Sequence, residues 1–113
     1  MTTITVSLRN GAVACAPKEG NARVSPKGTI AWHSPVPGQK FRLTFHLQPF
    51  EGMPPRQDDW PFEGPKPKTA PSTDWCESFS ATVGDDGVFK YDVEVKDASG
   101  NISRLDPIII IRN

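Results

Sequence analysis

The amino-acid sequence predicts an all-β fold, a two-sheet antiparallel Greek-key sandwich of about seven strands. From Phe89 to Lys96, apolar and polar residues alternate with a period of two, as in a strand with one buried and one solvated face. Turn-forming residues recur roughly every eight to twelve positions, and no helical period is present. The 113 residues are enough for one self-sufficient core, so we expect a single domain over residues 1–113.

The N-terminal part of the chain repeats this alternation in several segments. Before residue 48 we expect four strands and one short extended piece, over residues 4–8, 12–16, 22–24, 29–33 and 41–47. In the segment 29–33, Ile30 and Trp32 should face inward while Ala31 and His33 face outward. The aromatic residues of the last N-terminal strand and of the strand that begins at Phe89 should form most of the core.

The C-terminal part of the chain adds three strands. We place them over residues 76–83, 88–96 and 108–111. The first two are joined by a hairpin turn at residues 85–87, and residues 97–101 combine Asp, Ser, Gly and Asn, which form turns readily. The four isoleucines of the last strand leave it no polar side. We therefore place this strand in the middle of a sheet, with both faces covered.

One long irregular region, residues 49–75, interrupts the strand pattern. It holds seven of the twelve prolines, and its apolar residues are nearly all aromatic. A long loop in a compact domain is usually functional, and aromatic residues on a proline-stiffened loop give a large contact area at low entropic cost. The candidate binding residues are Phe50, Arg56, Trp60, Phe62 and Trp75. The alternative is that the aromatic residues fold back and cap one open end of the sandwich.

Charge and composition narrow the set of partners. Thirteen basic and thirteen acidic residues cancel without a long run of one sign, which argues against nucleic acid and against an anionic membrane. No apolar stretch is long enough to span a bilayer. The N-terminal residues alternate like a strand and lack the features of a signal peptide, so we expect a cytoplasmic location.

Cys15 and Cys76 are the only cysteines in the chain. In a cytoplasmic protein they are expected to be reduced, small apolar side chains. A cross-sheet disulfide is the alternative. Neither cysteine lies in a CxxC motif or near a histidine, so we expect no metal or redox site through them.

Two stretches carry a family resemblance, Gly28-Thr29-Ile30-Ala31-Trp32 and Gly87-Val88-Phe89-Lys90-Tyr91-Asp92-Val93. They resemble the turn that opens the third strand and the Gly-x-aromatic-x-aromatic-x-Cys stretch of the cupredoxins, the plastocyanin-like sandwich family. The resemblance implies a cupredoxin-like sandwich. Val93 stands where the copper-binding cysteine would be, and no His or Met follows it. Because a type 1 copper site needs two imidazoles and a thiolate, we expect no copper here.

The hairpin over residues 93–103 resembles the last hairpin of bacterial immunoglobulin-like modules, which are structural or adhesive domains. Cys15, Trp32 and Cys76 superficially form the Cys–Trp–Cys set of such domains. However, Cys76 precedes the Asp-x-Gly corner instead of following it, and Phe89 stands in place of the corner tyrosine. An immunoglobulin-like module is the alternative to the cupredoxin-like interpretation.

No arrangement of side chains predicts catalysis. Nothing in the sequence activates a particular serine, and the acidic pairs 58–59 and 85–86 are adjacent residues that point opposite ways on a strand. His33 and His46 fall on outward faces, so a surface metal site on neighbouring strands is a further alternative. We expect no enzyme activity, no catalytic residues, no metal and no cofactor.

The function predicted from these features is that of a non-catalytic binding or interaction protein. It should recognise another protein or a small ligand through the 49–75 loop. A homodimer through an edge strand is a second prediction, because an unpaired edge invites pairing with another chain.

Overall fold

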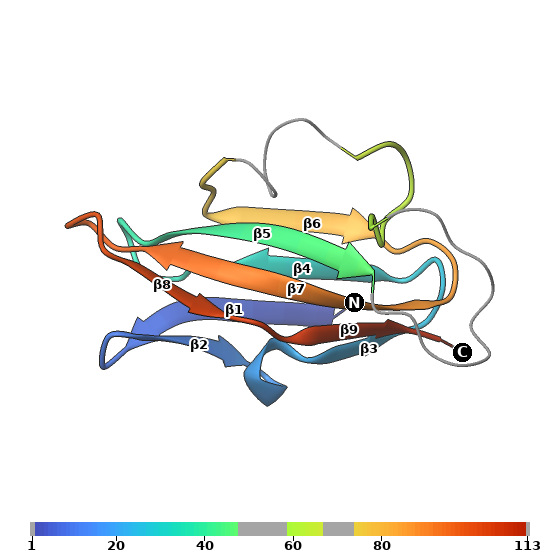
Figure 1. Cartoon of the computed structure of the whole chain (residues 1–113), viewed down its shortest axis with the longest axis horizontal. Coiled ribbons are helices and arrows are strands. Elements are labelled where there is room, and N and C mark those ends of the chain that lie inside the picture. Colours follow the sequence, from blue (N-terminus) through green and yellow to red (C-terminus); the bar gives the residue numbers. More distant parts are fainter. Residues whose placement is uncertain (1, 48–58, 67–73, 113) are drawn as a thin grey trace.

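Two mixed β-sheets face each other across a shared core in the computed structural model of the protein (Figure 1). The structure describes residues 2–47, 59–66 and 74–112. Within these residues it contains one short 3-10 turn and nine strands: β1 (Thr2–Arg9), β2 (Ala12–Ala16), η1 (Lys18–Gly20), β3 (Ala22–Val24), β4 (Thr29–His33), β5 (Lys40–Leu47), β6 (Ser78–Thr82), β7 (Gly87–Lys96), β8 (Ile102–Leu105) and β9 (Ile108–Ile111). The predicted all-β, two-sheet sandwich is confirmed.

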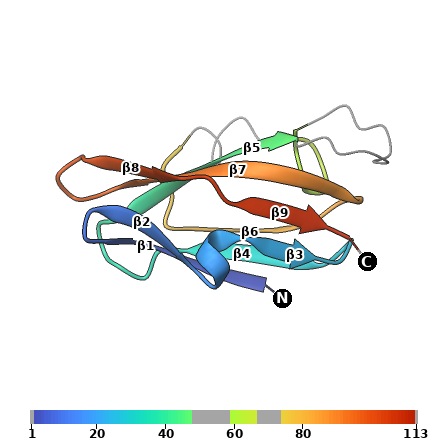
Figure 2. The same ribbon diagram turned by 60° about the horizontal axis from the view of Figure 1, so that its bottom comes forward.

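Each sheet joins strands that are far apart in the sequence. The order is β2-β1-β4-β6 in the β1 sheet and β3-β9-β7-β5 in the β7 sheet, where β8 also pairs with β7. Figure 2 shows the two layers, with β5, β7 and β9 in one and β1, β4 and β6 in the other. β1 runs parallel to β4 and β3 runs parallel to β9. The sheets are therefore mixed, whereas the sequence predicted purely antiparallel sheets.

The strand count exceeds the predicted seven because two short segments also pair. The 22–24 piece forms β3 against β9. β7 has ten residues, and on one side its first part pairs with β9 while its second part pairs with β8. β8 has only four residues, which is too short for a period-two pattern to distinguish it from the turn before it.

No helix among the described residues is long and apolar enough to cross a membrane.

The core between the sheets is centred on Trp32 of β4 and Tyr91 of β7, whose exposed fraction is 0%. The Trp32 Nε1–H donates to Tyr91 Oη at 3.3 Å, and the Tyr91 hydroxyl donates to the Gly20 carbonyl oxygen. Burial raises the pKa of Tyr91, which keeps this hydroxyl protonated. Three more aromatic rings surround Trp32 at centroid distances of 6.0 Å, from Phe45, Phe62 and Phe79. The inward position predicted for Trp32 is confirmed.

β9 lies inside its sheet, between β3 and β7, as predicted. Ile109 and Ile111 face the core and are fully buried. Ile108 and Ile110 lie on the outer face and are only half-buried, because their β7 neighbours on that face shield them partly. The prediction that both faces of this strand are covered is wrong for the outer face.

Candidate functional site

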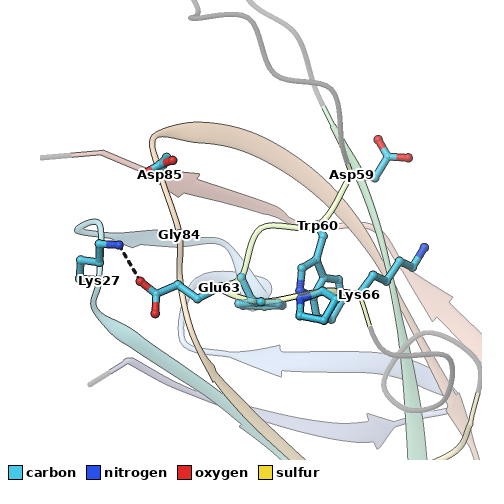
Figure 3. A pocket seen from close by; sticks show the side chains of 10 residues that line it. Lys27, Asp59, Trp60, Glu63, Lys66, Gly84 and Asp85 are labelled. Carbon is cyan, nitrogen blue, oxygen red and sulfur yellow. Dashed lines mark hydrogen bonds and ion pairs between the residues drawn. The ribbon is translucent and has the colours of Figure 1, made fainter.

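A cavity of about 530 Å³ lies at the end of the sandwich where β6 ends and where β4 and β7 begin. Its wall comes from the turn before β4, from residues 59–66, which we call the cavity loop, and from the turn after β6. The lining residues are Lys27, Asp59, Trp60, Phe62, Glu63, Gly64, Pro65, Lys66, Gly84 and Asp85 (Figure 3). The described part of the 49–75 insert thus supplies most of this wall.

Backbone hydrogen bonds fix the cavity loop against the end of β6. The Glu63 N–H donates to the Thr82 carbonyl oxygen, and the Gly84 N–H donates to the Pro61 carbonyl oxygen, both at 2.9 Å. Between these two bonds, Phe62 pairs with the residue after β6 as an isolated antiparallel bridge. The part of the loop around Phe62 therefore extends the β1 sheet locally and is buried, whereas residues 63–66 are exposed.

Trp60 and Phe62 form the apolar base of the cavity. Only 7% of Trp60 and 4% of Phe62 is exposed. The Phe62 ring lies 5.1 Å from the Phe45 ring and 5.0 Å from the Trp60 ring, in edge-to-face geometry. Such aromatic pairs contribute about 0.5–1.5 kcal/mol beyond the burial of their surface. The aromatic residues of the loop are therefore its anchors in the core.

Charged side chains form the rim of the cavity. Lys27 Nζ lies 2.7 Å from Glu63 Oε1, and Figure 3 shows this pair on one side of the cavity, with Asp59 and Lys66 on the other. The hydrogen bond and the charge of Glu63 raise the pKa of Lys27. With Asp85, the rim has two basic and three acidic side chains, so its net charge is 2 − 3 = −1.

The structure describes three of the five residues predicted to bind a partner, and these three do not lie together. Trp60 and Phe62 are core residues that also line the cavity. Trp75 lies elsewhere, against β5 and β7. Phe50 and Arg56 lie outside the residues that the structure describes. The capping alternative raised by the sequence thus describes Trp60 and Phe62 well.

Three lining residues lie outside the 49–75 insert in which the sequence analysis placed recognition, namely Lys27, Gly84 and Asp85. They belong to turns, and the sequence around them shows only turn chemistry. No local pattern indicates that these two turns meet the cavity loop. The sequence indicated their position only indirectly, since a turn at the end of a strand must lie at one end of the sandwich.

Trp75 is held by cations near the start of β5. The Arg42 guanidinium carbon lies 4.7 Å from the centre of the Trp75 ring, and Lys96 Nζ lies 5.0 Å from it. Arg42 also contacts both carboxylate oxygens of Glu94, at 3.0 and 3.2 Å. Cation–π contacts of this kind contribute on the order of 0.5–2 kcal/mol. They fix Trp75 on a part of the surface that does not include the cavity.

His33 and His46 lie on different sheets, in β4 and in β5. The neighbouring-strand arrangement proposed for a shared metal site is therefore wrong. Within residues 2–47, 59–66 and 74–112, no group of three or more His, Cys, Asp and Glu side chains is placed to hold a metal ion.

Cys15 and Cys76 are both free thiols, so the disulfide alternative is not formed. Burial raises the pKa of Cys15 to about 11. Burial also raises the pKa of Cys76, and a hydrogen bond with the Ser78 backbone lowers it in part. Both thiols are therefore protonated and weakly nucleophilic near neutral pH. Neither cysteine lines the cavity.

His46 belongs to an ion network on the outer face of the β7 sheet. Asp92 Oδ2 lies 2.7 Å from Arg104 Nη2 and 3.2 Å from His46 Nε2. Burial alone raises the pKa of Asp92, but hydrogen bonds and charges from Arg104 and His46 outweigh burial and hold this pKa below its ordinary value of 3.8. The pairing of β5 and β8 with β7 brings the three side chains together.

We expect this network to stabilise the fold near neutral pH and to lose its effect in acid. The pKa of Asp92 is lower in the folded chain than its ordinary value of 3.8 in the unfolded chain. Its contribution to the free energy of unfolding is therefore fully present above pH 3.8 and is lost as the pH falls through the pKa of the folded state. Urea denaturation should show a destabilisation by Asp92→Asn that shrinks as the pH is lowered. The control Asp106→Asn removes an exposed contact with Lys90 at 3.5 Å and should have a smaller effect. A destabilisation by Asp92→Asn that does not change with pH would contradict this expectation.

No known protein family and no curated protein sequence matches the chain. The function must therefore be inferred from the cavity and from the fold that positions it.

Proposed function

We propose that the chain is a non-catalytic binding protein and that it recognises its partner, a second protein or a small ligand, through the cavity. The observation that carries this proposal is the cavity itself, with about 530 Å³ of space, an aromatic base and a charged rim. Ligand sites are typically concave, and because half of the ten lining residues are charged, this cavity suits a polar or charged ligand. The cavity loop belongs to the region for which the sequence predicts recognition.

The lining chemistry favours binding over catalysis. None of the ten lining residues is Ser, Thr, Cys, Tyr or His, and the groups in the lining that can transfer protons are the carboxylates and the two lysines of the rim. The two closest charged groups of the rim, Lys27 and Glu63, neutralise each other in an exposed ion pair. These groups are suited to orienting a ligand.

The rim charges favour a ligand that carries a positive group on an apolar stem. Asp59 and Asp85 come from different segments, and both line the cavity together with Trp60 (Figure 3). A stem can pack against Trp60 and Pro65 while its cationic head lies near the acidic groups. Lysine and arginine side chains of a partner protein have this chemistry, and so do small basic molecules.

We also propose that the sandwich is cupredoxin-like and has no type 1 copper site. The two stretches that carry the resemblance meet in the core, where Trp32 donates a hydrogen bond to Tyr91 at 3.3 Å. Val93, at the position of the copper-binding cysteine, has an exposed fraction of 0% and pairs with Leu43 and Leu105. These apolar neighbours support a packing role for Val93.

An NMR titration of the isotope-labelled protein tests the binding role. The probes are Nα-acetyl-arginine methylamide and the matching blocked leucine and glutamate. We expect blocked arginine to shift the amide signals of the cavity loop, Gly84 and Asp85 saturably. Asp85→Lys should weaken this binding about tenfold or more, because it exchanges an attractive charge for a repulsive one at a cost of about 1.4 kcal/mol.

Asp86→Lys is the matched control, since it makes the same charge change at the next residue of the turn, which does not line the cavity. It should bind blocked arginine as the wild type does. Equal losses in both variants would mean that net charge attracts the probe. If only blocked leucine or blocked glutamate shifts these signals, the cavity binds a ligand but the proposal of a basic ligand is wrong. If no probe shifts them, a binding role for the cavity is contradicted.

A further inference from the structure

The edge of β6 is a second surface suited to association, apart from the cavity. Among the described residues, β6 is the last strand of the β1 sheet, and within that sheet it pairs with β4 along one side. The flanking residues Glu77 and Val83 direct their backbone bonds towards the segment that holds β4. Because backbone groups alternate between the two sides of an antiparallel strand, the N–H and C=O groups of Ser78 and Ser80 point to the other side.

The open part of this edge is short and bounded. At its C-terminal end the Thr82 carbonyl oxygen accepts the Glu63 N–H, so the cavity loop closes the edge there. The Ser78 N–H forms a hydrogen bond with the Cys76 thiol, whereas the Ser78 C=O and the backbone of Ser80 make no hydrogen bond with any residue in the ranges 2–47, 59–66 and 74–112. Outward-pointing N–H and C=O groups of this kind are a template for another strand.

β6 lacks the charged residues and the prolines that protect many edge strands. It reads Ser-Phe-Ser-Ala-Thr, without a charged residue or a proline. Phe79 and Ala81 face the core but stay partly exposed, whereas their β4 partners Trp32 and Ile30 are fully buried. The β1 sheet therefore ends before its apolar side is completely covered.

We propose that β6 pairs with β6 of a second copy of this chain, in an antiparallel arrangement centred on Phe79. A two-fold axis at this residue places Ser78 opposite the partner's Ser80, and Ser80 opposite the partner's Ser78. In each pair the Ser80 N–H donates to the Ser78 carbonyl oxygen of the other copy, and the Ser78 N–H donates to the Ser80 carbonyl oxygen of the other copy when it exchanges its contact with Cys76, so about two to four hydrogen bonds form. Phe79 then lies opposite the partner's Phe79 in a position without ladder hydrogen bonds, where side chains approach most closely.

A second copy fits this edge because the open window is self-complementary. It has outward backbone groups at both ends and one partly exposed aromatic residue between them, as a two-fold interface requires. The uncharged strand brings no repulsion between identical chains. Pairing would join two four-stranded sheets into one sheet of 4 + 4 = 8 strands and would cover the Phe79 side chain from its open side.

Sedimentation velocity from micromolar to millimolar concentration tests the pairing. The wild type should show a monomer–dimer equilibrium. Ser78→Lys/Ser80→Lys and Ser78→Glu/Ser80→Glu each place like charges opposite each other, so each should dimerise at least about tenfold more weakly. An equimolar mixture of the two double variants should form a heterodimer, because lysine then faces glutamate at both pairs.

Thr3→Lys/Thr5→Lys is the matched control, because it adds the same charge to the outer face of β1, an interior strand of the same sheet. This variant should dimerise as the wild type does, and so should Asp85→Lys, since the cavity is not part of the pairing. A wild type that stays monomeric at millimolar concentration would overturn the proposal. So would full dimerisation of both charged double variants, or a mixture of them that forms no heterodimer.

Discussion

Phe62→Ala is expected to lower the free energy of unfolding by about 3–5 kcal/mol, the usual cost of removing a buried phenylalanine side chain. Only 4% of Phe62 is exposed, and its ring contacts the rings of Trp32, Phe45 and Phe79 at 5.1–6.0 Å. The substitution removes these contacts and leaves a cavity between the sheets. Urea denaturation followed by tryptophan fluorescence measures the loss.

Lys66→Ala is the control within the same loop. Lys66 is an exposed rim residue, so its replacement should change stability by no more than about 0.5 kcal/mol. Native-state hydrogen exchange should show the Glu63 amide protected in the wild type and in Lys66→Ala, but exchanging faster in Phe62→Ala. Equal and small effects of both substitutions would show that the cavity loop is not part of the core.

Gly20→Ala should cost about 2–5 kcal/mol. Gly20 has a φ of 86°, which costs an L-residue about 1–2 kcal/mol, and overpacking of a core adds about 1–3 kcal/mol. A Cβ atom at this position would lie 3.0 Å from Tyr91 Oη, 3.1 Å from Cys15 Cβ and 3.1 Å from Pro107 Cγ. The new methyl group must therefore displace the hydroxyl that joins Trp32 to the Gly20 carbonyl. Thermal or urea denaturation measures the combined effect.

Gly11→Ala separates the two contributions. Gly11 has a similar φ of 80°, but no heavy atom lies within 4 Å of the position that its Cβ would take. Its replacement should therefore cost only the backbone part, about 1–2 kcal/mol. The near-ultraviolet circular dichroism of the aromatic core should change in Gly20→Ala and stay constant in Gly11→Ala. If both substitutions cost the same, the close approach of Gly20 to Tyr91 has no effect on stability.

The candidate site shows where prediction from the sequence ended. The aromatic, proline-rich character of residues 49–75 indicated a functional region, but the same residues are equally suited to a binding edge and to a core cap. In the structure Trp60 and Phe62 are buried and have both roles, since they pack in the core and also line the cavity. Lys27 and Asp85 reach the rim only because two turns meet the cavity loop there.

The sequence by itself determined seven of the nine strands of the described residues and the direction in which their side chains point. Period-two alternation is a local property of an extended backbone, so Trp32 and the aromatic residues of β5 and β7 could be assigned to the core without knowledge of their partners. Only the tertiary structure decided which strands are neighbours. The parallel pairing of β1 with β4, the separation of His33 from His46 and the contact of Gly20 with Tyr91 all join residues distant in sequence. Such contacts depend on sheet order and register, which are fixed by the packing of the whole core and leave no local pattern in the chain.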